Sequence, residues 1–283
     1  MTKNVLAVLG GSGLYAMEGL EATEEITVDT PFGAPSDKIV RGRLGDTTLL
    51  FLPRHGRGHR VPPHQINYRA NVCALKMAGA THLVSVSAVG SMKEEIVPGH
   101  LVVVDQFVDL TKKRVTTFFD DGVAGHVAFA EPVCKLLATE LAAAAETSGA
   151  KVHRGGTYVC IEGPQFSSRA ESLIYRSWGV SVIGMTSMPE AKLAREAELP
   201  FSTLALATDY DCWHDDHDHV TVEAVVATMK ANVASAQKAI AALAARLPDP
   251  TKSVAHGAAR GAVMTAPDAM PADAKARLGW LLG

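Results

Sequence analysis

The chain has 283 residues, of which 47% are hydrophobic and 20% charged, and its formal net charge is −3. This length suits one large α/β domain or two small ones, and the composition excludes a mostly disordered chain. The small net charge gives no general attraction for nucleic acid or an anionic membrane, so any anion site must be local.

The cysteines Cys73, Cys134, Cys160 and Cys212 are scattered and lack the spacing of a zinc cluster or a disulfide framework. No apolar stretch reaches transmembrane length, and the short apolar run at residues 4–9 ends in glycine, unlike a signal peptide. We therefore expect a cytoplasmic protein that binds neither nucleic acid nor a membrane.

Strand-like and helix-like segments alternate along most of the chain. Short apolar runs predict strands, and longer runs with helical periodicity predict helices. We expect strands at residues 4–9, 37–44, 47–53, 81–89, 101–108, 157–161, 180–185 and 202–208, and helices at 64–79, 131–149, 169–178, 190–197 and 222–246. This alternation predicts one α/β domain over residues 1–246, with a central mixed, largely parallel sheet flanked by helices.

The remaining residues, 247–283, contain four prolines and many small side chains. This composition predicts an extended C-terminal arm that ends in a short helix near residues 271–282, and not a second packed domain. An arm of this kind can cross onto a neighbouring subunit.

The first strand ends in the glycine turn Gly10-Gly11-Ser12-Gly13. Its backbone N–H groups and the Ser12 hydroxyl can bind an anion. A dinucleotide fingerprint with Asp29 as its ribose-binding acid is an alternative, but that motif needs a helix directly after the glycines, and residues 30–35 are rich in turn formers. A plain turn without a ligand is a third interpretation.

A basic loop follows the strand at 47–53. Three arginines and two histidines fall within seven residues: Arg54, His55, Arg57, His59 and Arg60. Guanidinium groups bind phosphate through a planar fork, so this loop indicates an oxyanion site. The alternative is a solvated basic loop, and the absence of GxxxxGK[ST] argues against a nucleoside triphosphate.

Hydroxyl side chains cluster at the end of the strand at 81–89, including Ser85 and Ser87. Ligands of open α/β sheets bind beyond the carboxyl ends of strands, so these hydroxyls are candidate ligands.

The segment 162–171 has the pattern of a helix start. Ser167 or Ser168 can cap the helix, and Glu171 can complete a capping box. Phe166, directly before the cap, can stack on a planar base.

Asp209 and Asp211 follow the strand at 202–208. In an extended chain, side chains two residues apart point to the same side. Two close carboxylates in a partly dry cleft oppose each other's ionisation, so one can keep its proton near neutral pH. Such a pair offers a donor for N7 of adenine and an acceptor for its 6-amino group, whereas a solvent-exposed acidic turn is the alternative.

Three histidines and three aspartates make up residues 214–219. Adjacent ligands rarely converge on one metal ion, and no HExxH motif is present, so we expect a solvated loop and no metal site.

Taken together, these segments resemble the trimeric purine nucleoside phosphorylase family over about residues 4–245, and within it the branch that acts on 5'-methylthioadenosine. The motifs that carry the resemblance occur in family order: Gly10-Gly11-Ser12-Gly13-Leu14, Thr30-Pro31-Phe32-Gly33, Arg54-His55-Gly56-Arg57, Gly90-Ser91, residues 162–171, residues 185–190 and residues 208–213. The resemblance implies a homotrimer that needs no metal or organic cofactor, with inorganic phosphate as a co-substrate.

The resemblance also implies a role for individual positions. The phosphate site is expected at Ser12, Arg54, His55, Ser87, Ala88 and Thr186. The nucleoside site is expected at Phe166, Ser167 and Met185, with Val222, Val225 and Val226 around the 5'-methylthio group and His126 reaching it from a neighbouring subunit. Asp209 and Asp211 are the candidate catalytic residues, with Asp209 protonating N7 and Asp211 accepting from the 6-amino group.

Some positions depart from the family pattern. Ser12 and Ser87 stand where relatives often carry threonine, and both keep the hydroxyl. Gly184 stands where many methylthioadenosine enzymes have asparagine and nucleoside phosphorylases have glycine. The arm after residue 246 matches no closing helix of the family, so its role is not implied.

The expected reaction is phosphorolysis of 5'-methylthioadenosine to adenine and 5-methylthioribose 1-phosphate, in purine and methionine salvage. The closest alternative is phosphorolysis of another purine nucleoside, namely methylthioinosine, adenosine, inosine or guanosine. The Asp209/Asp211 pair favours adenine, because relatives that act on 6-oxopurines place asparagine or another reader where Asp209 stands. A nucleotide-binding protein without catalysis is the alternative of a different class.

Overall fold

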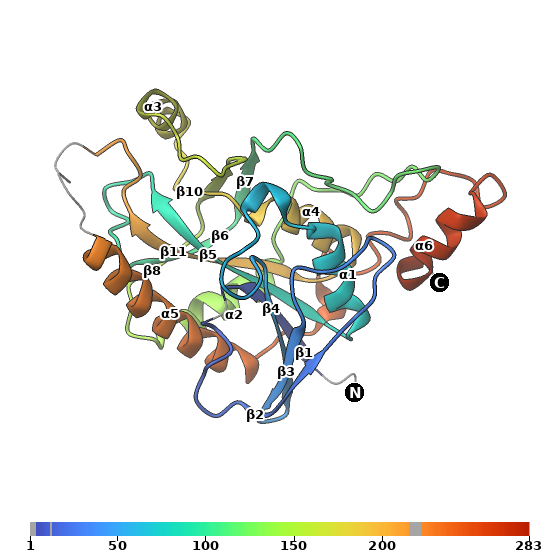
Figure 1. The fold of residues 1–283 in the computed structure, drawn as a ribbon, viewed down its shortest axis with the longest axis horizontal. Coiled ribbons are helices and arrows are strands. Elements are labelled where there is room, and N and C mark those ends of the chain that lie inside the picture. The colour runs from blue at the N-terminus through green and yellow to red at the C-terminus, as the bar shows by residue number, and fades with distance from the viewer. Residues whose placement is uncertain (1–3, 12, 215–221, 283) are drawn as a thin grey trace.

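The computed structural model describes residues 4–11, 13–214 and 222–282, with the side chains of residues 222–226 outside that description. One twisted sheet crosses the centre of the molecule, and helices cover both of its faces (Figure 1). The predicted α/β class and mixed, largely parallel sheet are confirmed. The strands are β1 (Val5–Gly10), β2 (Glu21–Ile26), β3 (Ile39–Leu44), β4 (Thr47–Pro53), β5 (His82–Ser91), β6 (Leu101–Val104), β7 (Gln106–Asp109), β8 (Val152–Arg154), β9 (Thr157–Cys160), β10 (Val182–Gly184) and β11 (Phe201–Asp209).

Strand β5 is the branch point of the sheet. It pairs in parallel with β1 on one side and with β11 on the other, and its last residues pair with β10 in the antiparallel sense. From β1 the sheet continues through β4 and β3 to the edge strand β2. From β11 it continues to β6 and β8, and from β10 to β9 and β7. Because three branches meet at β5, residues near its end lie beside residues from distant parts of the chain.

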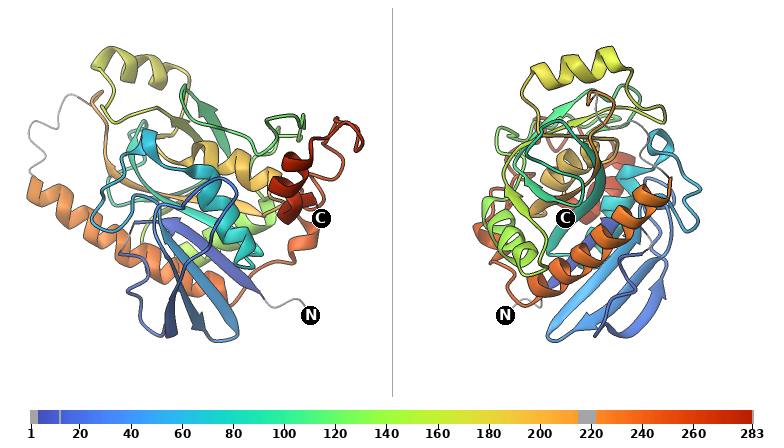
Figure 2. Two further views of the ribbon diagram at one scale, coloured as in Figure 1. Left: turned by 45° about the vertical axis from the view of Figure 1, so that its right-hand side comes forward. Right: turned by 90° about the vertical axis from the view of Figure 1, so that its left-hand side faces the viewer.

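Two helical layers sandwich the sheet (Figure 2). Helices α2 (Lys135–Glu146) and α5 (Val222–Ala244) pack together on one face, around buried aliphatic side chains such as Leu137, Leu141 and Ile240. Alanine-rich surfaces let these two helices approach closely. Helices α1 (Tyr68–Met77) and α4 (Ser187–Glu196) cover the other face, where Leu75 and Leu193 are fully buried. Each face of the sheet therefore has its own hydrophobic core.

Helix α3 (Arg169–Ser177) lies apart from these layers, at the top of Figures 1 and 2. Ser168 caps it and Glu171 completes the capping box, as the sequence predicts. Ser172 is its buried residue, whereas Leu173, Ile174 and the adjoining Trp178 are about half exposed in the single chain. Side chains of the helix reach the rest of the chain at Ser172, which bonds to Asp211, and at Arg176, which bonds to the Met92 carbonyl.

The sequence prediction differs from the structure at four elements. The helix expected at 64–79 begins at Tyr68, because a 3₁₀ turn (Pro63–Gln65) precedes it and Asn67 provides the cap. The strand expected at 101–108 is two strands that break at Asp105. Strands β2 and β8 were not predicted, since β2 is an exposed, glutamate-rich edge strand and β8 has three residues. Short edge strands lack the apolar pattern that identifies a buried strand.

The C-terminal segment, residues 247–282, packs against its own chain. Its 3₁₀ turn (Pro250–Lys252) is followed by irregular structure and by helix α6 (Ala272–Leu282), at the position where the sequence predicts a helix. Ala274 and Leu278 of α6 are fully buried, and the Trp280 ring lies edge-on to Phe118 at 5.0 Å. Residues 262–265 also bond to the backbone of residues 124–126, so the arm is a brace for that loop.

Candidate active site

The parallel strands β1, β4, β5 and β11 direct their carboxyl ends to one edge of the sheet. Arg54 directly follows β4, and its backbone N–H donates to the Gly10 carbonyl at 3.1 Å. Strand β10 runs antiparallel to β5, so the chain that leaves it brings Thr186 back beside Ser87 in the middle of β5. Segments far apart in sequence therefore meet at this edge.

A buried cluster forms there from Arg54, Ser85, Ser87, Thr186 and Glu190. The side chains of Arg54 and Glu190 are 3% and 1% exposed, and they pair through Nε–Oε1 at 2.7 Å and Nη2–Oε2 at 2.9 Å. The Ser85 hydroxyl accepts from Arg54 Nη2 at 2.7 Å and donates to Glu190 Oε2 at 2.7 Å. A two-pronged pair of this kind fixes the guanidinium plane and balances its charge.

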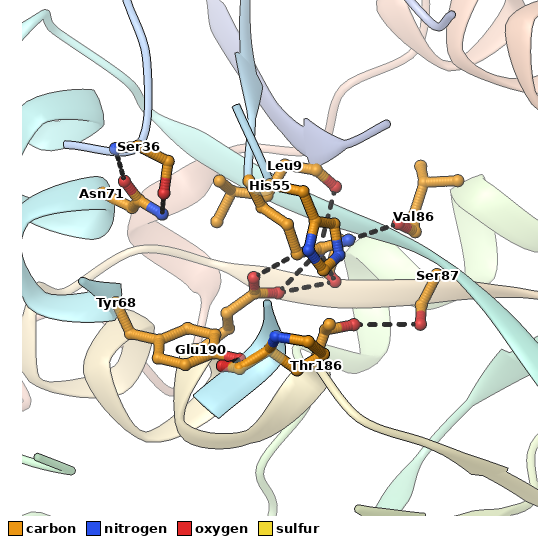
Figure 3. Close-up of polar contacts among 12 residues, drawn as sticks. Leu9, Ser36, His55, Tyr68, Asn71, Val86, Ser87, Thr186 and Glu190 are labelled. Atoms are coloured by element: carbon orange, nitrogen blue, oxygen red, sulfur yellow. Dashed lines mark hydrogen bonds and ion pairs between the residues drawn. The ribbon is translucent and has the colours of Figure 1, made fainter. Parts of the chain in front are cut away.

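Backbone carbonyls complete the surroundings of Arg54. Nη1 donates to Val86 O at 2.8 Å, and Nη2 donates to Leu9 O at 3.1 Å (Figure 3). Within the described part of the chain, Nη1 makes this one hydrogen bond, so its second N–H is left for another acceptor. Arg54, expected at the phosphate site, is thus a buried group with most of its donors committed, and not part of a solvated basic loop.

The other two arginines of the basic loop are exposed and bond elsewhere. Arg57 pairs with Glu25 at 2.6 Å, and its backbone N–H donates to Asp37 at 2.7 Å. Arg60 lies 3.9 Å from the same Asp37 carboxylate. The structure therefore separates one buried arginine from two surface arginines that the sequence pattern had grouped together.

Two hydroxyls form the other half of the buried cluster. Ser87 Oγ lies 3.1 Å from Thr186 Oγ1 (Figure 3). It also lies 3.2 Å from the Tyr158 hydroxyl. The Thr186 N–H donates to the same tyrosine oxygen at 3.4 Å. Tyr158 is fully buried and thus fixes both residues, while Ala88, the next residue of β5, is exposed.

His55 has a defined tautomer. Its Nδ1 lies 2.9 Å from the Val61 carbonyl, which can only accept, so Nδ1 carries the proton and Nε2 is an acceptor. Burial and the neighbouring charge of Arg54 lower the pKa of His55 to about 4. The ring is therefore neutral near pH 7, and it stacks on His59 at 4.1 Å.

The acidic cluster consists of Asp209, Asp211, Thr208, Ser172 and Cys212. Thr208 Oγ1 donates to Asp209 Oδ2 at 2.7 Å, and the Asp211 N–H donates to Asp209 Oδ1 at 2.8 Å. Ser172 of α3 donates to Asp211 Oδ2, and the Cys212 thiol lies 3.7 Å from the same oxygen. Each carboxylate is thus oriented by neighbours on the same turn or on α3.

One sequence-based expectation about this pair is wrong. Asp211 does not continue an extended strand, because β11 ends at Asp209 and Asp211 has a positive φ of 53°. The alternation of side chains along a strand therefore does not set its direction. The turn places the Asp211 N–H on the Asp209 carboxylate, so the two aspartates interact through the backbone. Gly90 of β5 leaves room for this turn, since a Cβ there would lie 3.0 Å from Asp209 Oδ1.

The loop at residues 161–168 lies beside the acidic cluster, since Cys212 Sγ donates to the Ser167 carbonyl at 3.4 Å. Phe166 is 85% exposed and lines, with Ser167, an open cavity of about 690 Å³. The Ser167 hydroxyl is buried and has no hydrogen-bond partner among the described residues. Met185 reaches the same loop, because a Cβ on Gly163 would lie 2.5 Å from its Sδ.

A smaller cavity of about 100 Å³ joins the glycine turn to the acidic cluster. It is lined by Gly11, Gly13, Leu14, Val86, Ala88, Leu206, Thr208, Met229, Asn232 and Val233. Most of this lining is apolar, and it comes from the glycine turn after β1, from strands β5 and β11, and from α5. The glycine turn is followed, in the described residues, by further turns and by β2, which excludes the helix that a dinucleotide fingerprint requires.

Several expected ligands are not placed at these clusters. Ser12 lies outside the described residues, as do the side chains of Val222, Val225 and Val226 at the start of α5. His126 lies in an exposed loop, where its N–H donates to Ala262 O at 2.8 Å. In the single chain, His126 therefore contacts the C-terminal segment and neither of the two clusters.

The sequence analysis did not identify Glu190, Tyr158 or Arg114. Glu190 could have been found from its position, because it is the one charged residue in the motif at 185–190 and charged residues are rarely buried without a partner. Tyr158 reads as an ordinary strand residue, and Arg114 reads as part of a basic stretch with Lys112 and Lys113.

No group of three or more metal-ligand side chains occurs among the described residues. Most of the histidine–aspartate stretch at 214–219 lies outside them. In the parts of the chain that the structure covers, no helix has the length and apolar character needed to span a bilayer.

Comparison with known proteins agrees with this architecture. The phosphorylase superfamily matches residues 5–245. The S-methyl-5'-thioadenosine phosphorylase of Geobacter sulfurreducens is 55% identical over 282 residues, which are 99% of each chain, and that of Synechocystis is 50% identical over all of this chain and 88% of its own.

Solved structures give the same result. The crystal structure of methylthioadenosine phosphorylase from an antarctic soil metagenomic library superposes with a TM-score of 0.94 at 46% identity, covering 100% of both chains. Methylthioadenosine phosphorylase from Schistosoma mansoni in complex with adenine gives 0.84 at 35% identity, over 92% of this chain and 99% of the other. The chain, with its buried and acidic clusters at one edge of the sheet, belongs to the phosphorylase superfamily.

Proposed function

We propose that this chain is an enzyme of purine and methionine salvage that cleaves 5'-methylthioadenosine with inorganic phosphate, giving adenine and 5-methylthioribose 1-phosphate. The observation that carries the proposal is the pairing of an arginine–hydroxyl cluster with an aspartate pair at one sheet edge. The names of the relatives at 50–55% identity support the same reaction.

The buried cluster supplies the phosphate site in this proposal. Arg54 offers the uncommitted N–H of Nη1, and Ser87 and Thr186 offer hydroxyls that Tyr158 holds in place. The glycine turn with Ser12 and the backbone at Ala88 complete the site. Preorganised donors of this kind hold phosphate in line with C1' at little further entropic cost.

In the proposed phosphate site, the tautomer of His55 makes it a hydrogen-bond acceptor. Its neutral ring presents Nε2 as an acceptor, so it receives a hydrogen bond from the protonated oxygen of monohydrogen phosphate. In this proposal Arg54 supplies the positive charge for phosphate, and His55 stays neutral.

The acidic cluster and the loop at 161–168 hold the base. Phe166 stacks on the purine, and Met185 and the Ser167 hydroxyl, which has no partner in the part of the chain that the structure describes, contact the nucleoside. As the C1'–N9 bond breaks, its electron pair moves into the purine and a phosphate oxygen bonds to C1', through an oxocarbenium-like sugar. Asp209 gives its proton to N7, which neutralises the leaving base, and Asp211 accepts from the 6-amino group.

The proposal assigns the 5'-methylthio group to the apolar cavity between the glycine turn and α5, the helix that also carries Val222, Val225 and Val226. The proposal includes a homotrimer in which His126 of a neighbour closes that end, because His126 does not reach the clusters of its own chain. It also includes a cytoplasmic location, which suits four cysteines that form no disulfide.

Gly184 is the residue that favours one of the alternative purine nucleosides as a second candidate substrate. A Cβ at this position would lie 2.0 Å from the hydroxyl oxygen of the buried Tyr158, so an asparagine does not fit here without moving the tyrosine. The glycine shared with nucleoside phosphorylases makes a 6-oxopurine nucleoside the second candidate substrate.

The deciding experiment incubates the protein with methylthioadenosine, methylthioinosine, adenosine and inosine, with and without phosphate, and identifies the released base by chromatography. We expect adenine from methylthioadenosine only when phosphate is present. Release of hypoxanthine at a higher rate would support the second candidate, and release of base without phosphate would contradict phosphorolysis.

A further inference from the structure

Arg114 is a buried cation that the proposed mechanism does not use. It lies in the irregular segment after β7, and its side chain is 1% exposed. A guanidinium group placed so deep must satisfy five N–H donors, so its partners show what it holds together.

One set of partners is the start of the loop that carries Phe166. Arg114 Nε donates to Glu162 Oε1 at 3.0 Å, and Nη2 donates to the Glu162 carbonyl at 2.7 Å and to the Ile161 carbonyl at 3.3 Å. The other oxygen of Glu162 accepts from the N–H groups of Lys112 and Lys113 at 2.5 and 3.0 Å. The segment at residues 112–114 therefore donates five hydrogen bonds to the start of this loop.

The second set of partners belongs to the segment that carries Met185 and Thr186. Nη1 donates to the Met185 carbonyl at 2.7 Å and to the Met188 carbonyl at 2.6 Å. It also contacts the Tyr68 hydroxyl at 2.8 Å, and the guanidinium lies 5.1 Å from the centre of that ring. One side chain thus joins the exits of β9 and β10 to the start of α1.

We propose that Arg114 is a positioning residue that sets the distance between the base loop at 161–168 and the sugar–phosphate segment at 185–188. The expected effect on turnover rests on the proposed function. The connection of the two segments through Arg114 rests on its hydrogen bonds alone. Arg114 touches the carbonyl sides of both segments, while Phe166 and Thr186 are the groups directed to substrate.

Lysine cannot replace this link. Its three donors share one nitrogen, whereas the guanidinium spreads its donors over three nitrogens that reach two loops at once. Loss of that span lets the loops move independently, and a misplacement of about 1 Å costs on the order of 10²-fold in rate.

The test compares Arg114→Lys with Arg195→Lys. Arg195 is a matched control, since it is also buried and bonds to backbone carbonyls, at Ala128 and Glu131, but joins neither loop. Steady-state kinetics are measured with methylthioadenosine and phosphate varied in turn, beside thermal unfolding. We expect kcat to fall about 10²-fold in Arg114→Lys and to stay near wild type in Arg195→Lys, although both lose stability.

Hydrogen exchange gives a readout that needs no turnover. Arg114→Lys is expected to speed amide exchange in residues 112–113, 161–168 and 185–188, whereas Arg195→Lys speeds exchange at 128–131. If wild type releases no purine with phosphate, the proposed function fails, and the exchange pattern still decides whether Arg114 links the loops.

The inference is overturned if Arg114→Lys keeps wild-type kcat, or if its exchange increases are the same as those of the control. If Arg114→Lys does not fold, Glu162→Gln tests the same link, because it removes the charge pair and leaves the carbonyl contacts. A smaller fall in kcat with faster exchange at 112–113 supports the link, and unchanged kcat and exchange refute it.

Discussion

The buried and acidic clusters lie at the same edge of the sheet but are built differently. In the buried cluster, Arg54 and Glu190 are almost inaccessible, and their partners are strand carbonyls and fixed hydroxyls. The acidic cluster lies on a turn after β11 and is completed by α3 and by a loop whose Phe166 is 85% exposed. One cluster is part of the core, and the other is assembled from loops.

This difference has a functional meaning. Phosphate is the same in every phosphorolysis, so its proposed site can be made rigid by core residues. The base and the 5' group vary among nucleosides, and loops change more readily than a core. We therefore expect substitutions in the buried cluster to affect stability and phosphate together, and substitutions in the acidic cluster to affect turnover and base preference alone.

The largest effect is expected from Asp209→Ala. Removal of the proton donor to N7 should lower kcat on methylthioadenosine by about 10²–10⁴-fold. Thermal unfolding should change little, because Asp209 is only partly buried. Asp105→Ala is the control, since Asp105 accepts from the Gly156 N–H outside both clusters and its loss should leave kcat unchanged. A near-normal kcat in Asp209→Ala would disprove the general-acid role.

Glu190→Gln should combine a loss of stability with a loss of phosphate affinity. Removing the charge that balances Arg54 leaves a buried cation without its partner, which costs about 3 kcal/mol. Urea unfolding and the KM for phosphate measure the two effects. Glu196→Gln, a buried carboxylate at the end of the same helix that bonds to the Phe118 N–H, should lose stability only. Equal phosphate KM values in the two variants would mean that Arg54 does not depend on Glu190 for binding.

Thr186→Val should raise the KM for phosphate about tenfold, which corresponds to one hydrogen bond of about 1.4 kcal/mol. The KM for methylthioadenosine should change less, because the hydroxyl faces Ser87 in the buried cluster. Thr203→Val is the matched control. Thr203 is fully buried in β11 and its hydroxyl has no partner among the described residues, so its removal should be neutral. If both KM values rise equally, the two clusters are not separate in function.

The smallest effect concerns the acid stability that His55 controls. Because burial lowers its pKa from 6.5 to about 4, the unfolded chain binds a proton in this range that the folded chain does not. Stability should therefore fall as the pH drops from 6.5 towards 4. His55→Gln removes this contribution, so its melting temperature should fall less between about pH 7 and pH 5 than that of wild type.

Glu196 acts in the opposite sense, since burial raises its pKa to about 6 and the folded chain gains the proton first. That contribution is the same in wild type and in His55→Gln, so it cancels in the comparison. The exposed His256→Gln should follow wild type. If His55→Gln also follows wild type, His55 is not held neutral by burial.

The sequence predicted most elements of the core because buried strands and amphipathic helices have clear periodicities. It missed β2 and β8, whose exposed or short sequences carry no such pattern. The basic-loop pattern also grouped Arg54 with Arg57, although one lies in the core and the other pairs with Glu25 on the surface, and only the family resemblance singled out Arg54. Composition and spacing do not distinguish a buried from an exposed arginine.

The sequence alone determined the α/β class, the segments that reach one edge of the sheet and the chemical types of the groups there, because these follow from local pattern and residue chemistry. Only the tertiary structure decided which groups meet. The antiparallel return of β10 puts Thr186 beside Ser87, and the positive φ of Asp211 turns its N–H onto Asp209. Arg114 bonds to both Glu162 and Met185, which lie on separate loops. These are non-local contacts, and they depend on strand order and direction, which no local pattern encodes.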